Sequence, residues 1–143
     1  MMYLGSTLTK IFPDLGILLL NGPLGAGKTT LVKGIAKSLK IQEPITSPTF
    51  PLSQHYPLGS PPLVHLDLYR IEEKNAANEF FLQEEEESKA IGALMVVEWP
   101  ERLSLPMPDA WRGKLEYSSE NQSRFFQLIP PLDKDNKLSI SSK

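Results

Sequence analysis

The sequence predicts an α/β fold built on a mainly parallel central sheet. Short apolar runs at residues 17–20, 63–66 and 93–97 have the length of buried strands. A helix-period pattern follows the first run, and a stretch rich in helix formers separates the second run from the third. In sheets of this kind ligands collect at the carboxyl ends of the strands, so we expect the chemistry where these three runs end.

The first predicted strand leads directly into a glycine-rich loop. Residues 22–29 read Gly22-Pro23-Leu24-Gly25-Ala26-Gly27-Lys28-Thr29, which is the phosphate-binding pattern G-x-x-x-x-G-K-[ST]. The glycines let the backbone curl until several N–H groups point at one anion. Lys28 can reach β- and γ-phosphates, and the Thr29 hydroxyl can ligate Mg²⁺. We therefore expect nucleotide binding and a P-loop NTPase-type fold of three layers with a mixed, mainly parallel sheet.

A helix is predicted over residues 29–40, immediately after the loop. Its apolar residues share one helical face, and they are Leu31, Val32, Ile35, Ala36 and Leu39. The N-terminus of this helix would point the positive end of its dipole at the loop.

Proline and glycine are frequent between residues 44 and 62, which predicts an extended segment over 46–53 followed by a loop over 56–62. The extended segment contains Thr49, at a position where nucleotide switches often place a hydroxyl near Mg²⁺ and the γ-phosphate. An ordinary strand entry next to a proline is the alternative. The Glu-rich stretch 71–89 predicts a solvated helix face or a loose loop, to which we assign no chemistry.

Two acidic residues follow the second and third apolar runs, Asp67 and Glu98. A phosphate-loop enzyme needs an acid at the end of a neighbouring strand to hold Mg²⁺ or its waters. Spacing alone does not rank the two, and either acid could instead cap a turn. For Trp99, next to Glu98, packing is the default interpretation.

The rest of the chain is predicted to complete a single domain over residues 1–132. Residues 1–16 lead into the first strand, and Pro106, Pro108 and Trp111 are expected in a loop. Residues 114–117 and 125–129 are expected to add antiparallel strands at the sheet edge. The polar residues 133–143 predict a disordered tail.

Composition limits the function classes. The 143 residues carry a net charge of −2, so no overall attraction to nucleic acid is evident. The absence of cysteine excludes disulfides, Cys-ligated zinc and thiol catalysis, and it fits a reducing cytosol. No apolar run is long enough to span a bilayer. We expect a cytoplasmic protein without a membrane segment or disulfide partners.

Four motifs in this order resemble the bacterial TsaE/YjeE family of small P-loop ATPases. They are GPLGAGKTT at 22–30, SPTF at 47–50, HLDLYR at 65–70 and EW at 98–99. The P-loop is shared by many families, whereas HLDLYR after SPTF is far more specific. The resemblance runs from about residue 3 to residue 126. It implies a role in threonylcarbamoyladenosine (t⁶A) modification of tRNA together with the TsaB and TsaD proteins, with tRNA contacted indirectly and no transfer of the threonylcarbamoyl group.

The resemblance also implies residue roles. Thr29 and Glu98 would bind Mg²⁺, which selects Glu98 as the Walker B-type acid and leaves Asp67 to orient or deprotonate the attacking water. Thr49 would lie in a switch-like segment, with Lys28 on the β- and γ-phosphates. The residues implied to bind ATP are Gly22, Pro23, Leu24, Gly25, Ala26, Gly27, Lys28, Thr29 and Thr30, with Trp99 near the nucleotide and Arg124 matching a late family arginine.

The activity implied is a weak, partner-stimulated ATPase that uses ATP and Mg²⁺. A small P-loop kinase is one alternative, but the chain has only four arginines to clamp phosphates and little room for a lid. A GTPase is disfavoured because no D-x-x-G follows the second strand and no N-K-x-D occurs. A nucleotide-dependent scaffold without hydrolysis is the third alternative, and it differs only in turnover.

Overall fold

The computed structural model describes residues 2–11, 16–23, 27–46, 52–118, 120, 123–131 and 140–142. In chain order the elements are α1 (Met2–Ile11), β1 (Ile17–Asn21), α2 (Lys28–Ser38), β2 (Ser53–Tyr56), β3 (Leu63–Asp67), α3 (Lys74–Ala90), β4 (Leu94–Glu98), the 3₁₀ turn η1 (Pro100–Arg102), β5 (Trp111–Ser118), β6 (Ser123–Ile129) and β7 (Ile140–Ser142).

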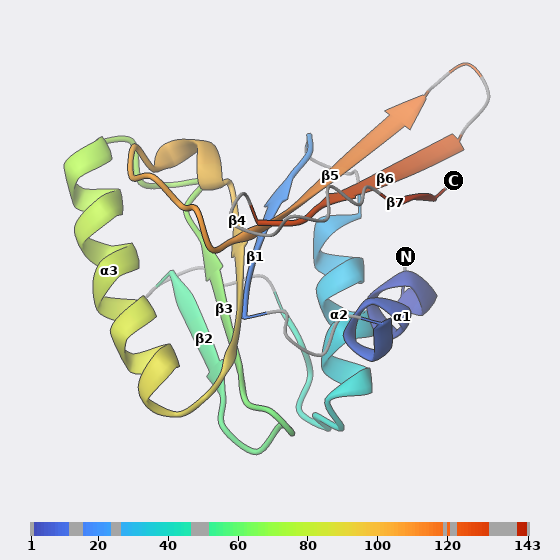
Figure 1. The fold of residues 1–143 in the computed structure, drawn as a ribbon, viewed down its shortest axis with the longest axis horizontal. Coiled ribbons are helices and arrows are strands. Elements are labelled where there is room, and N and C mark those ends of the chain that lie inside the picture. The colour runs from blue at the N-terminus through green and yellow to red at the C-terminus, as the bar shows by residue number, and fades with distance from the viewer. Residues whose placement is uncertain are drawn as a thin grey trace.

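The strands form one sheet in the order β2-β3-β4-β1-β5-β6-β7. The four inner strands β3, β4, β1 and β5 run parallel, whereas β2, β6 and β7 add antiparallel strands outside them. Helices α1 and α2 lie on one side of the sheet and α3 lies on the other (Figure 1). The predicted P-loop NTPase-type, three-layer α/β fold is therefore confirmed.

Two apolar clusters hold the layers together, one on each face of the sheet. Alternate residues of β1 divide between them, because successive side chains of a strand point to opposite faces. Leu18 and Leu20 pack in the cluster that contains the buried face of α2, and Leu19 packs in the cluster that contains Phe81 of α3. The apolar face predicted for the helix after the loop is the face that α2 buries.

Helix α1 was not expected from the sequence, which predicted only a lead into β1. The helix packs on α2, and an added Cβ at Gly5 would lie 2.7 Å from the backbone nitrogen of Ile35. The hydroxyl groups of Thr9 and Ser38 also form a hydrogen bond between the two helices. Isolated helices of this length are marginal in water, so contacts with α2 rather than intrinsic propensity explain α1.

Three further boundaries differ from the prediction. Ser53–Tyr56 forms the edge strand β2, where the sequence predicted the end of an extended segment and the start of a loop. Trp111 was expected in a loop, but it begins β5, where it is buried and pairs with Leu18. Residues 140–142, inside the expected tail, pair with β6 as β7.

The expected late strands form the antiparallel pair β5–β6. Within the described residues, no helix has the length and apolarity that crossing a bilayer would require.

Candidate functional site

Three parallel strands end side by side in the middle of the sheet. Leu20 of β1 and Asp67 of β3 are both register partners of Glu98 in β4. Partners on one rung of a parallel sheet direct their side chains to the same face. Val96, two residues before Glu98, packs in the cluster that contains α2. Glu98 and Asp67 therefore share the α2 face of the sheet.

Helix α2 begins at the same place and carries Lys28 as its first residue. Gly27 precedes it with φ 101°, a left-handed conformation that glycine adopts without a steric penalty. Because Gly27 has no side chain, nothing from this residue caps the N–H groups of the first turn. This arrangement leaves the positive end of the helix available to an anion.

The Lys28 ammonium is held by two contacts. Nζ donates a hydrogen bond to the Gly22 carbonyl oxygen at 2.6 Å and lies 4.0 Å from the centroid of the Trp99 ring. Burial lowers the pKa of Lys28, while the negative charges of Glu98, Glu101 and Asp67 act in the opposite direction. Lys28 is thus electrostatically coupled to both strand-end carboxylates.

Trp99 owes its position to an unusual backbone. Its φ of 61° and ψ of 50° are left-handed, which costs a non-glycine residue about 1–2 kcal/mol. The turn brings the indole ring against Lys28 and within 4.8 Å, centroid to centroid, of the Tyr69 ring. Arg102 Nη2 donates a hydrogen bond to the Tyr69 carbonyl oxygen at 3.0 Å. Trp99 contacts the lysine directly, in addition to the packing that the sequence suggested.

Glu98 is almost completely buried and lies close to the His65 imidazole. His65 Nε2 lies 2.6 Å from Glu98 Oε2, and the His65 side chain is fully buried. When the Glu98 carboxylate is ionised it can only accept, and in that state Nε2 carries the hydrogen and donates it. His65 was not among the residues predicted for the site. The available signal was its position two residues before Asp67, which places both residues on one face of the strand.

Asp67 lies opposite Glu98 on the neighbouring strand β3. Its backbone N–H donates to the Leu52 carbonyl at 3.0 Å, and its Oδ1 accepts from the Tyr69 N–H at 3.0 Å. Burial raises the pKa of Asp67, and the neighbouring Glu98 raises it further. The Tyr69 hydrogen bond and the charges of His65 and Lys28 act to lower it.

The donor set suits magnesium. Asp67 and Glu98 are adjacent carboxylates, and Thr29 follows Lys28 in the first turn of α2. Mg²⁺ prefers hard oxygen ligands, and it is usually bound through one or two carboxylates together with substrate phosphates. Burial raises the pKa of Asp67, the Glu98 charge raises it further, and a bound cation would relieve the repulsion between the two carboxylates. The residues present therefore fit a magnesium ion.

Four of the residues expected at the site lie outside the described residues, namely Leu24, Gly25, Ala26 and Thr49. Pro23 is exposed before the loop, and Thr30 lies in the first turn of α2. Arg124 is exposed on β6, where its guanidinium carbon lies 6.0 Å from the Tyr117 ring on the paired strand β5. This contact lies within the β5–β6 hairpin.

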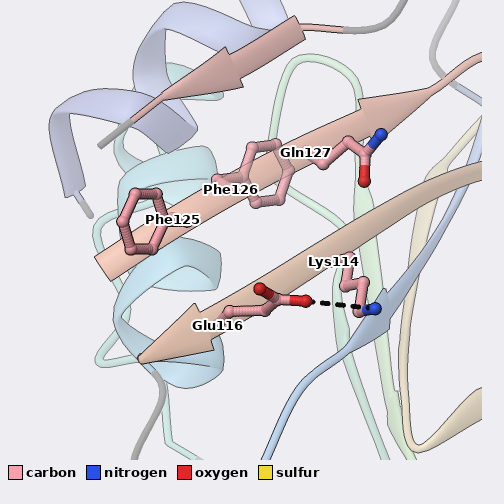
Figure 2. A pocket seen from close by; sticks show the side chains of 5 residues that line it. All are labelled: Lys114, Glu116, Phe125, Phe126 and Gln127. Atoms are coloured by element: carbon pink, nitrogen blue, oxygen red, sulfur yellow. Dashed lines mark ion pairs between the residues drawn. The ribbon is translucent and has the colours of Figure 1, made fainter. Parts of the chain in front are cut away.

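A hollow on the β5–β6 hairpin does not compete with this group as a nucleotide site. Figure 2 shows the five residues around it, and its volume is about 180 Å³. Ligand pockets for larger molecules usually enclose about 300–1,000 Å³. Its charged residues, Lys114 and Glu116, already form an exposed ion pair with Nζ and Oε1 3.1 Å apart.

One acidic residue of α3 is less solvated than the sequence suggested. Glu84 is buried, accepts a hydrogen bond from Ser53 Oγ at 3.1 Å and lies 2.6 Å from His55 Nε2. These contacts join α3 to the edge strand β2. The chain thus contains two His–Glu pairs of the same length, and only the His65–Glu98 pair lies at the strand ends.

A strand, a glycine-preceded helix start and acids at the ends of adjacent parallel strands place the chain in the P-loop NTPase class of α/β folds. Within that class the chain belongs to the TsaE family. The family model described as "Threonylcarbamoyl adenosine biosynthesis protein TsaE" matches residues 1–126.

Curated relatives agree with this assignment. A tRNA threonylcarbamoyladenosine biosynthesis protein TsaE from Nostoc sp. is 46% identical over 127 residues, covering 89% of this chain and 75% of the relative. The TsaE protein of Mycobacterium tuberculosis is 43% identical over 109 residues, covering 71% of this chain and 63% of the relative. Among solved structures, Bacillus subtilis YdiB matches with a TM-score of 0.54 and 26% identity, covering 83% of this chain and 74% of YdiB.

Proposed function

We propose that this protein is a magnesium-dependent ATP-binding protein with weak ATPase activity in the t⁶A modification of tRNA. The relatives named above are biosynthesis proteins of that modification, and the TsaE family resemblance includes action with TsaB and TsaD. We further propose that TsaB and TsaD stimulate hydrolysis, that tRNA is contacted indirectly, and that the protein works in the cytoplasm as one domain, whose sheet includes β7 beyond the expected boundary at residue 132.

One arrangement carries the proposal. Lys28, the first residue of α2, contacts Gly22 and Trp99, which directly follow the ends of β1 and β4. Asp67 and Glu98 are register partners where β3 and β4 end. Burial opposes the charge of Lys28, and Glu98 and Asp67 favour it. A lysine and two acids so arranged have a clear use where a polyphosphate and a cation must bind together. Lys28 would contact the β- and γ-phosphates, and Thr29 and Glu98 would hold the magnesium ion.

The chain's own residues would divide the work of hydrolysis. Magnesium, when bound, supplies positive charge beside the β- and γ-phosphates. Lys28 and the N–H groups of α2 neutralise charge on the phosphoryl group as its bond to ADP breaks. Asp67, whose pKa is raised by burial, orients the attacking water and accepts its proton. The Trp99 ring covers the lysine and limits water access to it, and the Tyr69 ring packs against Trp99.

The test is ATP hydrolysis by the purified protein, alone and with TsaB, TsaD and tRNA. We expect slow turnover alone and a rise with the complex. The variant Lys28→Ala should lose productive ATP binding, whereas Lys89→Ala, at an exposed position in the last turn of α3, is the matched control and should not. Unchanged ATP affinity and turnover in Lys28→Ala would contradict the assignment of Lys28 to the phosphate site. Phosphate transfer to an acceptor other than water would favour a kinase instead.

A further inference from the structure

The two histidines of this chain each form a 2.6 Å contact between Nε2 and a glutamate oxygen. His55 pairs with Glu84 at the sheet edge, and His55 is substantially exposed. His65 pairs with Glu98 at the strand ends, and both side chains are buried. The second pair includes Glu98, the residue that the proposed function assigns to magnesium binding.

We propose that His65 is a positioning residue that holds the Glu98 carboxylate in one orientation for magnesium. This inference rests on the proposed function and extends it to a residue that would contact neither ATP nor metal. The His65 Nε2–H occupies Oε2 of Glu98, which fixes the carboxylate plane and leaves Oε1 as the oxygen to offer a cation. Partners that orient a metal ligand in this way typically affect metal affinity by about 10–100-fold.

Burial explains why a fixed orientation matters here. Strand β4 is buried along its whole length, and Glu98 is its last residue. A carboxylate that could rotate freely there would lose hydrogen bonds to water without gaining a fixed partner, at a cost of several kcal/mol for an unpaired charge. His65, from the neighbouring parallel strand β3, supplies that partner across the sheet.

The other ring nitrogen offsets part of what the pair contributes to stability. His65 Nδ1 is buried and has no hydrogen-bond partner among the described residues. A buried polar atom without a partner costs about 1–3 kcal/mol. What His65 adds, and an apolar residue cannot add, is the Nε2–H at Glu98.

The experiment measures Mn²⁺ affinity by electron paramagnetic resonance, with the non-hydrolysable analogue AMPPNP bound. His65→Leu and His65→Asn both remove the donor at the Nε2 position, whereas His65→Gln retains an N–H there. We expect Mn²⁺ affinity to fall about 10-fold or more in the Leu and Asn variants and to recover substantially in the Gln variant. AMPPNP affinity measured by calorimetry in EDTA should change by less than about threefold.

The matched control is His55→Leu, which removes a His–Glu contact of equal length away from the site and should leave Mn²⁺ affinity unchanged. If His65→Asn binds Mn²⁺ as tightly as the unaltered protein, the inference is wrong. Equal losses of AMPPNP binding with and without Mn²⁺ would also overturn it, because they indicate a general structural role. If the unaltered protein binds AMPPNP but no variant differs, the proposed function survives and only the role of His65 fails. If the unaltered protein binds neither ligand, both fail together.

Discussion

The Nζ atom of Lys28 lies 4.0 Å from the centroid of the Trp99 ring while it donates a hydrogen bond to the Gly22 carbonyl. A cation over an aromatic face gains about 0.5–2 kcal/mol, depending on how far the pair is shielded from water. In the absence of phosphate, the lysine is therefore stabilised by the loop and by a residue of the Glu98-Trp99 motif. Any phosphate that reaches Lys28 must compete with these contacts.

The first prediction uses this contact as a signal. ATP should change the tryptophan fluorescence, because Lys28 would turn from the indole ring towards phosphate. Trp99→Phe should abolish most of the change while calorimetry still detects ATP binding within about tenfold of the original affinity. Trp111, the other tryptophan, is buried at the start of β5 and provides a constant background. A full fluorescence response in Trp99→Phe would contradict the assignment of the signal to the Lys28 contact.

The second prediction concerns magnesium. Glu98→Gln keeps the size of the side chain but removes its charge, so the Mg²⁺ concentration that gives half-maximal hydrolysis should rise about tenfold or more. ATP binding in EDTA should be nearly unaffected, since Lys28 and the start of α2 are unchanged. An unaltered Mg²⁺ titration would transfer the metal role to Asp67, the other acid on the same rung.

The third prediction follows from the pKa of Asp67, which burial raises above its ordinary value of 3.8. Because the folded state holds this proton more tightly than the unfolded state, stability from this group is present at low pH and is lost as the pH rises through the folded pKa. At pH 7 the buried charge opposes folding. Asp67→Asn, which keeps Oδ1 for the Tyr69 N–H, should therefore raise the melting temperature of the nucleotide-free protein in EDTA.

The pH dependence of the melting temperature distinguishes the removal of a buried charge from a general gain in stability. The gain from Asp67→Asn should shrink as the pH falls towards 4, because the folded aspartate then takes up its proton and the buried charge is lost. Asp109→Asn, a change at an exposed loop position, is the control and should move the melting temperature little. A gain of equal size at pH 4 and pH 7 would show that charge burial is not its cause.

The inner strands and α2 could be predicted because local signals there agree with the tertiary structure. Apolar runs of strand length are buried in β1, β3 and β4, and their ends bring Asp67 and Glu98 together as expected. Strand β5 was missed at its start because prolines precede it and Gly113 interrupts it. The Phe126 ring lies 2.8 Å from where a Cβ of Gly113 would be, so the glycine is required by packing across strands.

Side-chain partners at the site were harder to predict than its acids. That His65 meets Glu98 depends on the register of β3 against β4, and that Trp99 meets Lys28 depends on a left-handed turn. Neither register nor a strained turn can be read from one sequence. Arg102 illustrates the same limit, because no sequence motif links it to Tyr69, which it contacts in the structure.

The fourth prediction tests the contact that explains α1. In Gly5→Ala, the new methyl group would lie 2.7 Å from the Ile35 nitrogen and 3.0 Å from the Gly34 carbonyl carbon, both backbone atoms of α2 that cannot rotate away. Alanine gains about 1 kcal/mol over glycine in a helix interior, but forced separation of packed elements costs about 1–3 kcal/mol, so we expect a net loss of stability.

Denaturant unfolding measures this loss directly. Gly16→Ala, where the added Cβ has no atom within 4 Å, is the control and should be neutral or slightly stabilising. Because α2 also carries Lys28 at its start, a helix displaced by Gly5→Ala should bind ATP less tightly than the Gly16→Ala control. A Gly5→Ala protein as stable as the original would mean that α1 can move away from α2 freely, and its helix would then need an explanation other than packing.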